Sequence, residues 1–178
     1  MSEILKEGSR LRLRRAELAD VDYICALQEE ADNSDYIVPF PRDFHETIVT
    51  QGRAAMDIIV EERESGEAVG YLHVTGLLLA SKEQEWTHVI IGKKGRGYGH
   101  EAMKLLKAWA FGDMGAHRAW LDCKDYNARA LHLYESEGMV REALIRETIL
   151  HRGVYENLIV LGILDREYHA RKRAGLEL

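Results

Sequence analysis

A run of glycines between an apolar segment and an amphipathic one constrains this chain most. The segment Ile90-Ile91-Gly92-Lys93-Lys94-Gly95-Arg96-Gly97-Tyr98-Gly99 places four glycines in eight residues, and helical periodicity follows it. Glycine permits positive φ and a close approach of the backbone, and a helix N-terminus attracts anions. The sequence therefore predicts a strand, a phosphate-binding turn and a helix in direct succession, with positive charge from Lys93, Lys94 and Arg96.

Two common classes of phosphate site contain similar glycines, and the spacing tests each of them. A P-loop requires lysine and then serine or threonine after its second glycine, whereas Tyr98 and Gly99 follow Gly97. A dinucleotide-binding turn requires glycine at position 100, which is His100. Both classes are disfavoured, and a solvated turn without a ligand stays open as an alternative.

The remaining periodicities predict a mixed α/β (α+β) protein. We expect 1–178 to form a single domain with its core over about 10–165, followed by a polar tail at 166–178 with a frayed helix. Strands are expected at 10–14, 57–63, 68–75, 85–91, 117–123, 139–150 and 154–164, and helices at 20–28, 44–49, 99–112 and 127–137.

Charge and composition narrow the class of partner. The net charge is −6, which disfavours a nucleic-acid partner. Cys25 and Cys123 are too few and too far apart for a disulfide scaffold or a zinc site, and no apolar run is long enough for a membrane span. We expect a cytoplasmic protein without a membrane partner; its oligomeric state stays open, with a homo-oligomer among the alternatives.

A second motif lies downstream of the glycines. Asn127, Ala130, Tyr134 and Gly138 follow the spacing Asn-x-x-Ala-x-x-x-Tyr-x-x-x-Gly. Together with residues 94–99, this motif resembles the GNAT superfamily of N-acetyltransferases, over about 10–165 and strongest over 85–164, in the branch with spermidine and ribosomal-protein N-terminal acetyltransferases. Lys94 replaces the usual Arg or Gln, and Met139 replaces the usual Phe.

The resemblance implies a fold and a donor substrate. The fold would be a mostly antiparallel sheet of about seven strands, splayed between the fourth and fifth, with about four helices. The donor would be acetyl-coenzyme A (acetyl-CoA), with no metal. The implied cofactor-binding residues are Val89, Ile90, Ile91, Lys94, Gly95, Arg96, Gly97, Tyr98, Gly99, His100, Asn127 and Ala130.

Tyr134 is the candidate acid. An amine that attacks the thioester expels a thiolate, and a phenol can give that sulfur its proton. Glu85 and His88 are candidate bases. A separation of three along a strand predicts opposite faces, so that only one of them points into the site. The alternatives are a core residue for Tyr134 and solvated strand residues for Glu85 and His88.

Four carboxylates near the first helix, Glu29, Glu30, Asp32 and Asp35, are candidates for binding the acceptor, and they would suit a polyamine such as spermidine. Acidic residues at a helix C-terminus oppose the helix dipole, so helix stability does not explain them. A solvated face remains the alternative. A peptide or ribosomal-protein N-terminal acetyltransferase, a silent acyl-CoA sensor and a nucleotide-binding protein are the competing functions.

Overall fold

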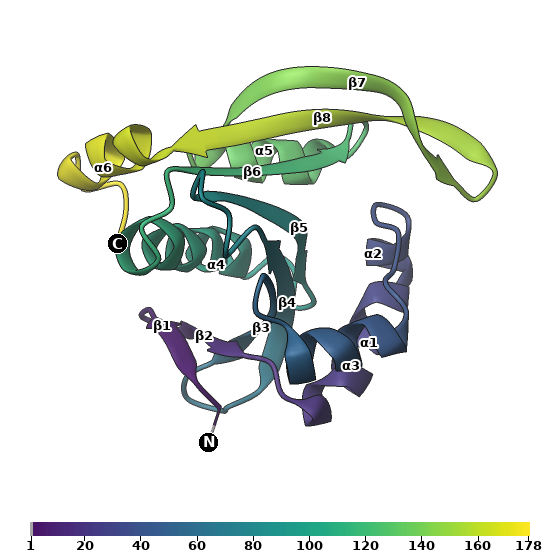
Figure 1. The fold of residues 1–178 in the computed structure, drawn as a ribbon, viewed down its shortest axis with the longest axis horizontal. Helices are drawn as coiled ribbons and strands as arrows, with labels where there is room; N and C mark the ends of the chain where they lie inside the picture. The colour runs from purple at the N-terminus through teal and green to yellow at the C-terminus, as the bar shows by residue number, and fades with distance from the viewer. Residues whose placement is uncertain (1) are drawn as a thin grey trace.

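The computed structural model describes residues 2–178, which fold around one eight-stranded sheet in the order β1-β2-β3-β4-β5-β6-β8-β7 (Figure 1). All neighbours are antiparallel except β5 and β6. This confirms the mixed, mostly antiparallel fold. The strands are β1 (Ile4–Glu7), β2 (Leu11–Arg15), β3 (Ala55–Glu62), β4 (Ala68–Thr75), β5 (Glu83–Ile91), β6 (Arg118–Lys124), β7 (Val140–His151) and β8 (Val154–Leu164).

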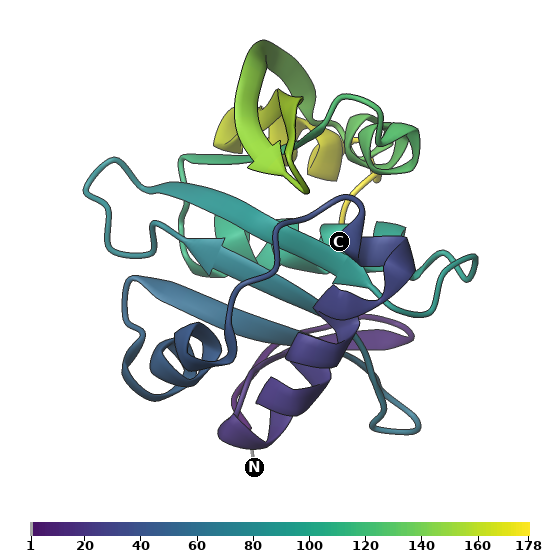
Figure 2. The ribbon, with the colours of Figure 1, turned by 90° about the vertical axis from the view of Figure 1, so that its right-hand side faces the viewer.

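Helices cover both faces of β2–β5 (Figure 2). Helices α1 (Val21–Glu29) and α3 (Arg42–Gln51) lie on one face, named the acceptor face. Helix α4 (Tyr98–Lys107) lies on the opposite face, named the donor face. Strand alternation produces this division, because Ile59 packs in the cluster with α1 while its neighbours Ile58 and Val60 pack in the cluster with α4.

The sheet opens between β5 and β6. These strands pair only through Glu83–Glu85 and Arg118–Trp120. The rest of both strands, Trp86–Ile91 and Leu121–Lys124, has no partner across the gap. This opening is the predicted splay between the fourth and fifth predicted strands. Helix α5 (Ala128–Ser136) follows β6.

The β7–β8 hairpin reaches past the opening, and its tip turns toward α2 (Ala31–Ser34) (Figure 1). Arg152 at the tip forms an ion pair with Asp35, and Lys124 Nζ donates to the Asp35 carbonyl at 2.8 Å. These contacts join the C-terminal half of the sheet to the chain after α1.

Three elements differ from the prediction. β1 and α2 were not predicted, because each spans only four residues and shows no periodicity of its own. The tail forms α6 (Asp165–Arg173), and its Tyr168 is fully buried and stacks on Phe111 at 5.1 Å. The tail therefore contributes to the core instead of lying outside it. No helix within residues 2–178 combines the length and the apolar character needed to cross a membrane.

Candidate active site

A single cavity of about 600 Å³ fills the opening between β5 and β6. Its walls are Trp86–Ile91 of β5, most of the turn over 93–100, Asp122–Lys124 of β6 and the inner side of α5. Tyr36, Ile37, Val38 and Phe40 line its acceptor end. The cavity thus connects the glycine turn to Tyr134 and to the loop after α2.

The glycines of the turn are required by backbone conformation. Gly95 and Gly97 have φ values of +77° and +74°, in the left-handed region that other residues avoid. Gly97 is the N-cap of α4 and no side chain caps that helix, so its first amides remain available to an anion. A Cβ at Gly99 would lie 3.1 Å from Leu133 Cδ2, so this glycine allows α5 to approach. The turn therefore fits a diphosphate.

Arg10, which directly precedes β2, and Glu62 of β3 hold the turn from the outer side. Arg10 Nη1 donates to the Arg96 carbonyl at 2.9 Å, and Arg10 Nε pairs with Glu101 at 2.8 Å. The Tyr98 hydroxyl donates to Glu62 Oε1 at 2.5 Å. Arg96 itself stays 61% exposed and does not line the cavity. The turn is therefore anchored mainly by Arg10, Glu62 and Glu101, and Arg96 Nη1 lies at the limit of ion-pair distance, 4.0 Å from Glu62 Oε1.

Lys94 and His100 of the turn have partners on α2 and at the C-terminal end of α5. Lys94 Nζ donates to Asn33 Oδ1 at 2.9 Å and lies 3.4 Å from Asp32 Oδ2, which connects the turn to α2. His100 Nδ1 lies 2.8 Å from Glu137 Oε1, and its ring is half exposed at the cavity wall.

Helix α5 positions the second motif. Asn127 is its N-cap, with Oδ1 accepting from the Ala130 amide at 3.2 Å. Asn127, Ala130 and Tyr134 all line the cavity. Tyr134 is buried, and burial, followed by the nearby Cys123 and Asp122, raises the pKa of its phenol well above the ordinary value. The hydroxyl is therefore protonated at neutral pH and able to donate.

The prediction that Glu85 and His88 face opposite sides of β5 is wrong, because β5 contains a bulge. Thr75 pairs with Glu85 and Val74 with Trp86, but His73 pairs with His88. The extra residue is Thr87, which restores Glu85 and His88 to one face, the acceptor face. Glu85 nevertheless lines a smaller cavity, of about 370 Å³, beside Thr75 and Trp120, while His88 lines the large one.

His88 lies in an apolar, histidine-rich environment. It is 5% exposed, and the Phe40 ring stacks on it with centroids 4.5 Å apart. Burial, followed by the charges of His73 and His45, lowers its pKa to about 3. Its Nδ1 has no hydrogen-bond partner among residues 2–178. The imidazole is therefore neutral at physiological pH, and it is a weak base.

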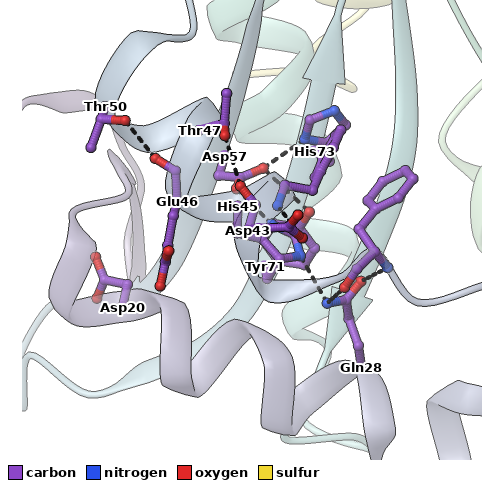
Figure 3. A network of polar contacts seen from close by, with 12 residues as sticks. Asp20, Gln28, Asp43, His45, Glu46, Thr47, Thr50, Asp57, Tyr71 and His73 are labelled. Atoms are coloured by element: carbon purple, nitrogen blue, oxygen red, sulfur yellow. Dashed lines mark hydrogen bonds and ion pairs between the residues drawn. The ribbon is translucent and has the colours of Figure 1, made fainter.

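A buried polar network supports this end of the cavity (Figure 3). Asp57 accepts from His45 Nδ1 at 2.8 Å and from His73 Nδ1 at 2.6 Å. His45 Nε2 lies 2.9 Å from Gln28 Nε2, and Gln28 Oε1 accepts from the Phe40 amide at 3.0 Å. If Nδ1 carries the His45 proton, Nε2 can accept from Gln28, and every contact is satisfied. The network therefore holds Phe40 against His88.

Of the four predicted acceptor carboxylates, only Asp32 lines the cavity. Glu29 and Glu30 are exposed, and Asp35 pairs with Arg152. Of the predicted catalytic and cofactor residues, all line the cavity except Glu85 and Arg96.

Sequence analysis missed the buried network and Asp122 on β6. Asp57, His73 and Asp122 each interrupt an apolar run within a strand, and that interruption was the available signal. A charged residue in the middle of a buried strand needs a partner or a function.

The fold and this site define an acyl-CoA-dependent acetyltransferase. The family description "Acetyltransferase (GNAT) domain" matches residues 10–140, and the chain belongs to this family. The donor substrate is acetyl-CoA. Within residues 2–178, no group of three or more His, Cys, Asp or Glu side chains is arranged to hold a metal ion.

Known relatives include two bacterial proteins. Spermidine N(1)-acetyltransferase of Vibrio cholerae is 22% identical over 168 residues, which cover 90% of this chain and 96% of the relative. An uncharacterized N-acetyltransferase p20 of Bacillus licheniformis is 26% identical over 174 residues, covering 89% and 95%.

Solved structures show the same fold. The spermidine N-acetyltransferase of Vibrio cholerae in complex with CoA and spermine superposes with a TM-score of 0.81 at 22% identity, covering 91% of this chain and 99% of that one. A GNAT-family acetyltransferase of Bacillus anthracis gives 0.77 at 21% identity, with the same coverages of 91% and 99%.

Proposed function

We propose that this enzyme transfers the acetyl group of acetyl-CoA to a primary amine of a polyamine such as spermidine, by direct attack while both substrates are bound. One observation carries the proposal: a single cavity joins the phosphate-binding turn, Tyr134 and the carboxylate-bearing end near Asp32. A polyamine carries several positive charges, which suits a chain of net charge −6. The likeness to the spermidine acetyltransferase of Vibrio cholerae, in sequence and in fold, supports the same substrate class.

In this proposal the backbone of 94–100 and the cavity-facing side of α5, at Asn127 and Ala130, bind the donor, and Val89–Ile91 pair with its pantetheine arm. Tyr134 donates to the departing sulfur. The exposed Glu29 and Glu30 attract the cationic acceptor toward the cavity mouth, while Asp32 and Asp35, whose charges are paired with Lys94 and Arg152, shape the acceptor end. We also propose that the enzyme acts in the cytoplasm without a nucleic-acid or membrane partner, and we leave a homo-oligomer open.

An amine panel tests the function. Thiol release from acetyl-CoA should be fastest with spermidine or spermine, and slower with free amino acids and peptides. Faster release with peptides would replace the polyamine by an N-terminal α-amine as acceptor. Binding of acetyl-CoA without thiol release from any amine would indicate a silent sensor and refute the enzyme.

The Tyr134→Phe variant tests the acid. It removes only the hydroxyl from a buried ring, so we expect kcat to fall at least about tenfold, with an unchanged acetyl-CoA dissociation constant. Tyr155→Phe is the matched control, because Tyr155 is 65% exposed on the hairpin and lies outside the cavity lining. If Tyr134→Phe kept the wild-type kcat, the proposed role of the phenol would be lost.

A further inference from the structure

Two carboxylates line the large cavity, Asp32 and Asp122. Asp32 lies 3.4 Å from Lys94 Nζ, so its charge is balanced. Asp122 is partly buried, and no residue among 2–178 neutralises it through an ion pair or a hydrogen bond. The only strong influences on its ionisation are burial and the neighbouring carboxylate of Glu85. A carboxylate held in this way lacks a cation, and the cavity leaves room for one to arrive with the substrate.

The position of Asp122 places it at the vertex of the opening. Trp120 is the partner of Glu85 in the last pair that joins β6 to β5, and Asp122 follows two residues later on the same face of β6. Leu121 and Cys123 point the other way, into the cluster that contains Tyr134. Asp122 therefore lies on the acceptor face, and Tyr134 packs on the donor face.

We propose that Asp122 binds the ammonium group of the acceptor and takes its proton, a role that rests on the proposed function. It would thus be the catalytic base, in place of Glu85 or His88. Glu85 borders the other cavity, and His88 is neutral, so it offers an ammonium group a lone pair but no negative charge.

The ammonium group loses two protons during the transfer. The Asp122 carboxylate accepts one proton from the ammonium, leaving a neutral amine. The nitrogen forms a bond to the carbonyl carbon while the carbon–sulfur bond breaks, and the sulfur takes the proton of Tyr134. The second proton lost by the nitrogen returns through water to the phenolate, and the proton on Asp122 leaves to water. The sum is an amide, a thiol and one released proton.

The neighbours of Asp122 favour this role. Burial and, after it, Glu85 raise its pKa, which narrows the gap to an amine of pKa near 10. On β8 its strand partner is the apolar Val160. Tyr134 of α5 and the adjacent Cys123 are titratable groups that interact electrostatically with Asp122. Both stay neutral at physiological pH because their pKa values are raised.

Three variants test the inference: Asp122→Asn, Asp122→Glu and Glu85→Gln. We expect Asp122→Asn to lower kcat/KM for spermidine at least about 100-fold, with an unchanged acetyl-CoA dissociation constant. Its Tm should equal or exceed that of the wild type, because an unbalanced carboxylate has been removed. Asp122→Glu should recover part of the activity, and Glu85→Gln should keep most of it.

The outcomes separate this inference from the proposed function. If the wild type releases thiol with amines and Asp122→Asn does so within about threefold of it, the role of Asp122 is refuted and the function stands. A loss of activity that merely parallels a fall in Tm would also refute the role, because it would show damage to the fold. A wild type that releases no thiol with any amine would overturn the function and this inference with it.

Discussion

Replacing Gly97 by alanine isolates the contribution of backbone conformation to donor binding. The added methyl would come no closer than 3.6 Å to another atom, Arg10 Nη2, so it causes no clash. The cost arises from the φ of +74°, which a residue with a Cβ adopts at a penalty of about 1–2 kcal/mol.

That penalty can lower either the stability of the free enzyme or its affinity for acetyl-CoA. If the free enzyme keeps the turn, Gly97→Ala lowers the free energy of unfolding by the full amount and leaves affinity unchanged. If the free turn moves to negative φ, stability is preserved and binding must restore the strained form, which weakens acetyl-CoA about 5–30-fold. Since Gly95, Arg96 and Gly97 are exposed, we expect mainly the second. The loss in the free energy of unfolding and the loss in the free energy of acetyl-CoA binding should sum to about 1–2 kcal/mol.

Calorimetric titration with acetyl-CoA, combined with denaturant unfolding of the apo enzyme, measures both parts. Gly97→Asn is the first control, because asparagine tolerates the left-handed region, so it should lose less affinity than alanine. Gly112→Ala is the second, because its φ is not positive and a Cβ there meets no atom within 4 Å. It should be neutral or slightly stabilising. If Gly97→Ala matched the wild type in both measurements, or Gly97→Asn were equally impaired, the reasoning from φ would be refuted.

Two buried carboxylates give predictions on stability. Burial raises the pKa of Asp57, but hydrogen bonds from His45 and His73 outweigh it and the net pKa is lowered. Ionised Asp57 therefore stabilises the fold above about pH 4, and this contribution is lost as the pH falls through the lowered pKa. The Tm gap between wild type and Asp57→Asn should be largest at neutral pH and close on acidification; a gap that widens would contradict this. The Glu177 side chain is fully buried and binds Lys107 Nζ and Arg171 Nε, both at 2.6 Å. Glu177→Gln should therefore lower the free energy of denaturant unfolding by about 3 kcal/mol. A loss no larger than that of Glu64→Gln, at an exposed position, would show that the pairing is unimportant.

Local patterns were sufficient for the parts of this protein that are local. The strand–turn–helix over 85–107 and the start of α5 at Asn127 depend on residues close in sequence, so periodicity, the glycines and the motif at Asn127 predicted them. The Asp57 network was not predictable in the same way, since its members come from α1, α3, β3 and β4. Their proximity depends on how the helices pack on the sheet, and no spacing in the sequence encodes it.

The bulge at Thr87 shows most clearly where reasoning from the sequence stops. Strict alternation assigns Glu85 and His88 to opposite faces of β5. A single inserted residue places them on the same face, and no feature of Glu-Trp-Thr-His-Val predicts that insertion. Glu85 belongs to the last pair that joins β5 to β6, and the two strands separate beyond it. A carboxylate that reaches the large cavity from the sheet then comes from the strand on the other side of the gap. Asp122 is the carboxylate that β6 provides there.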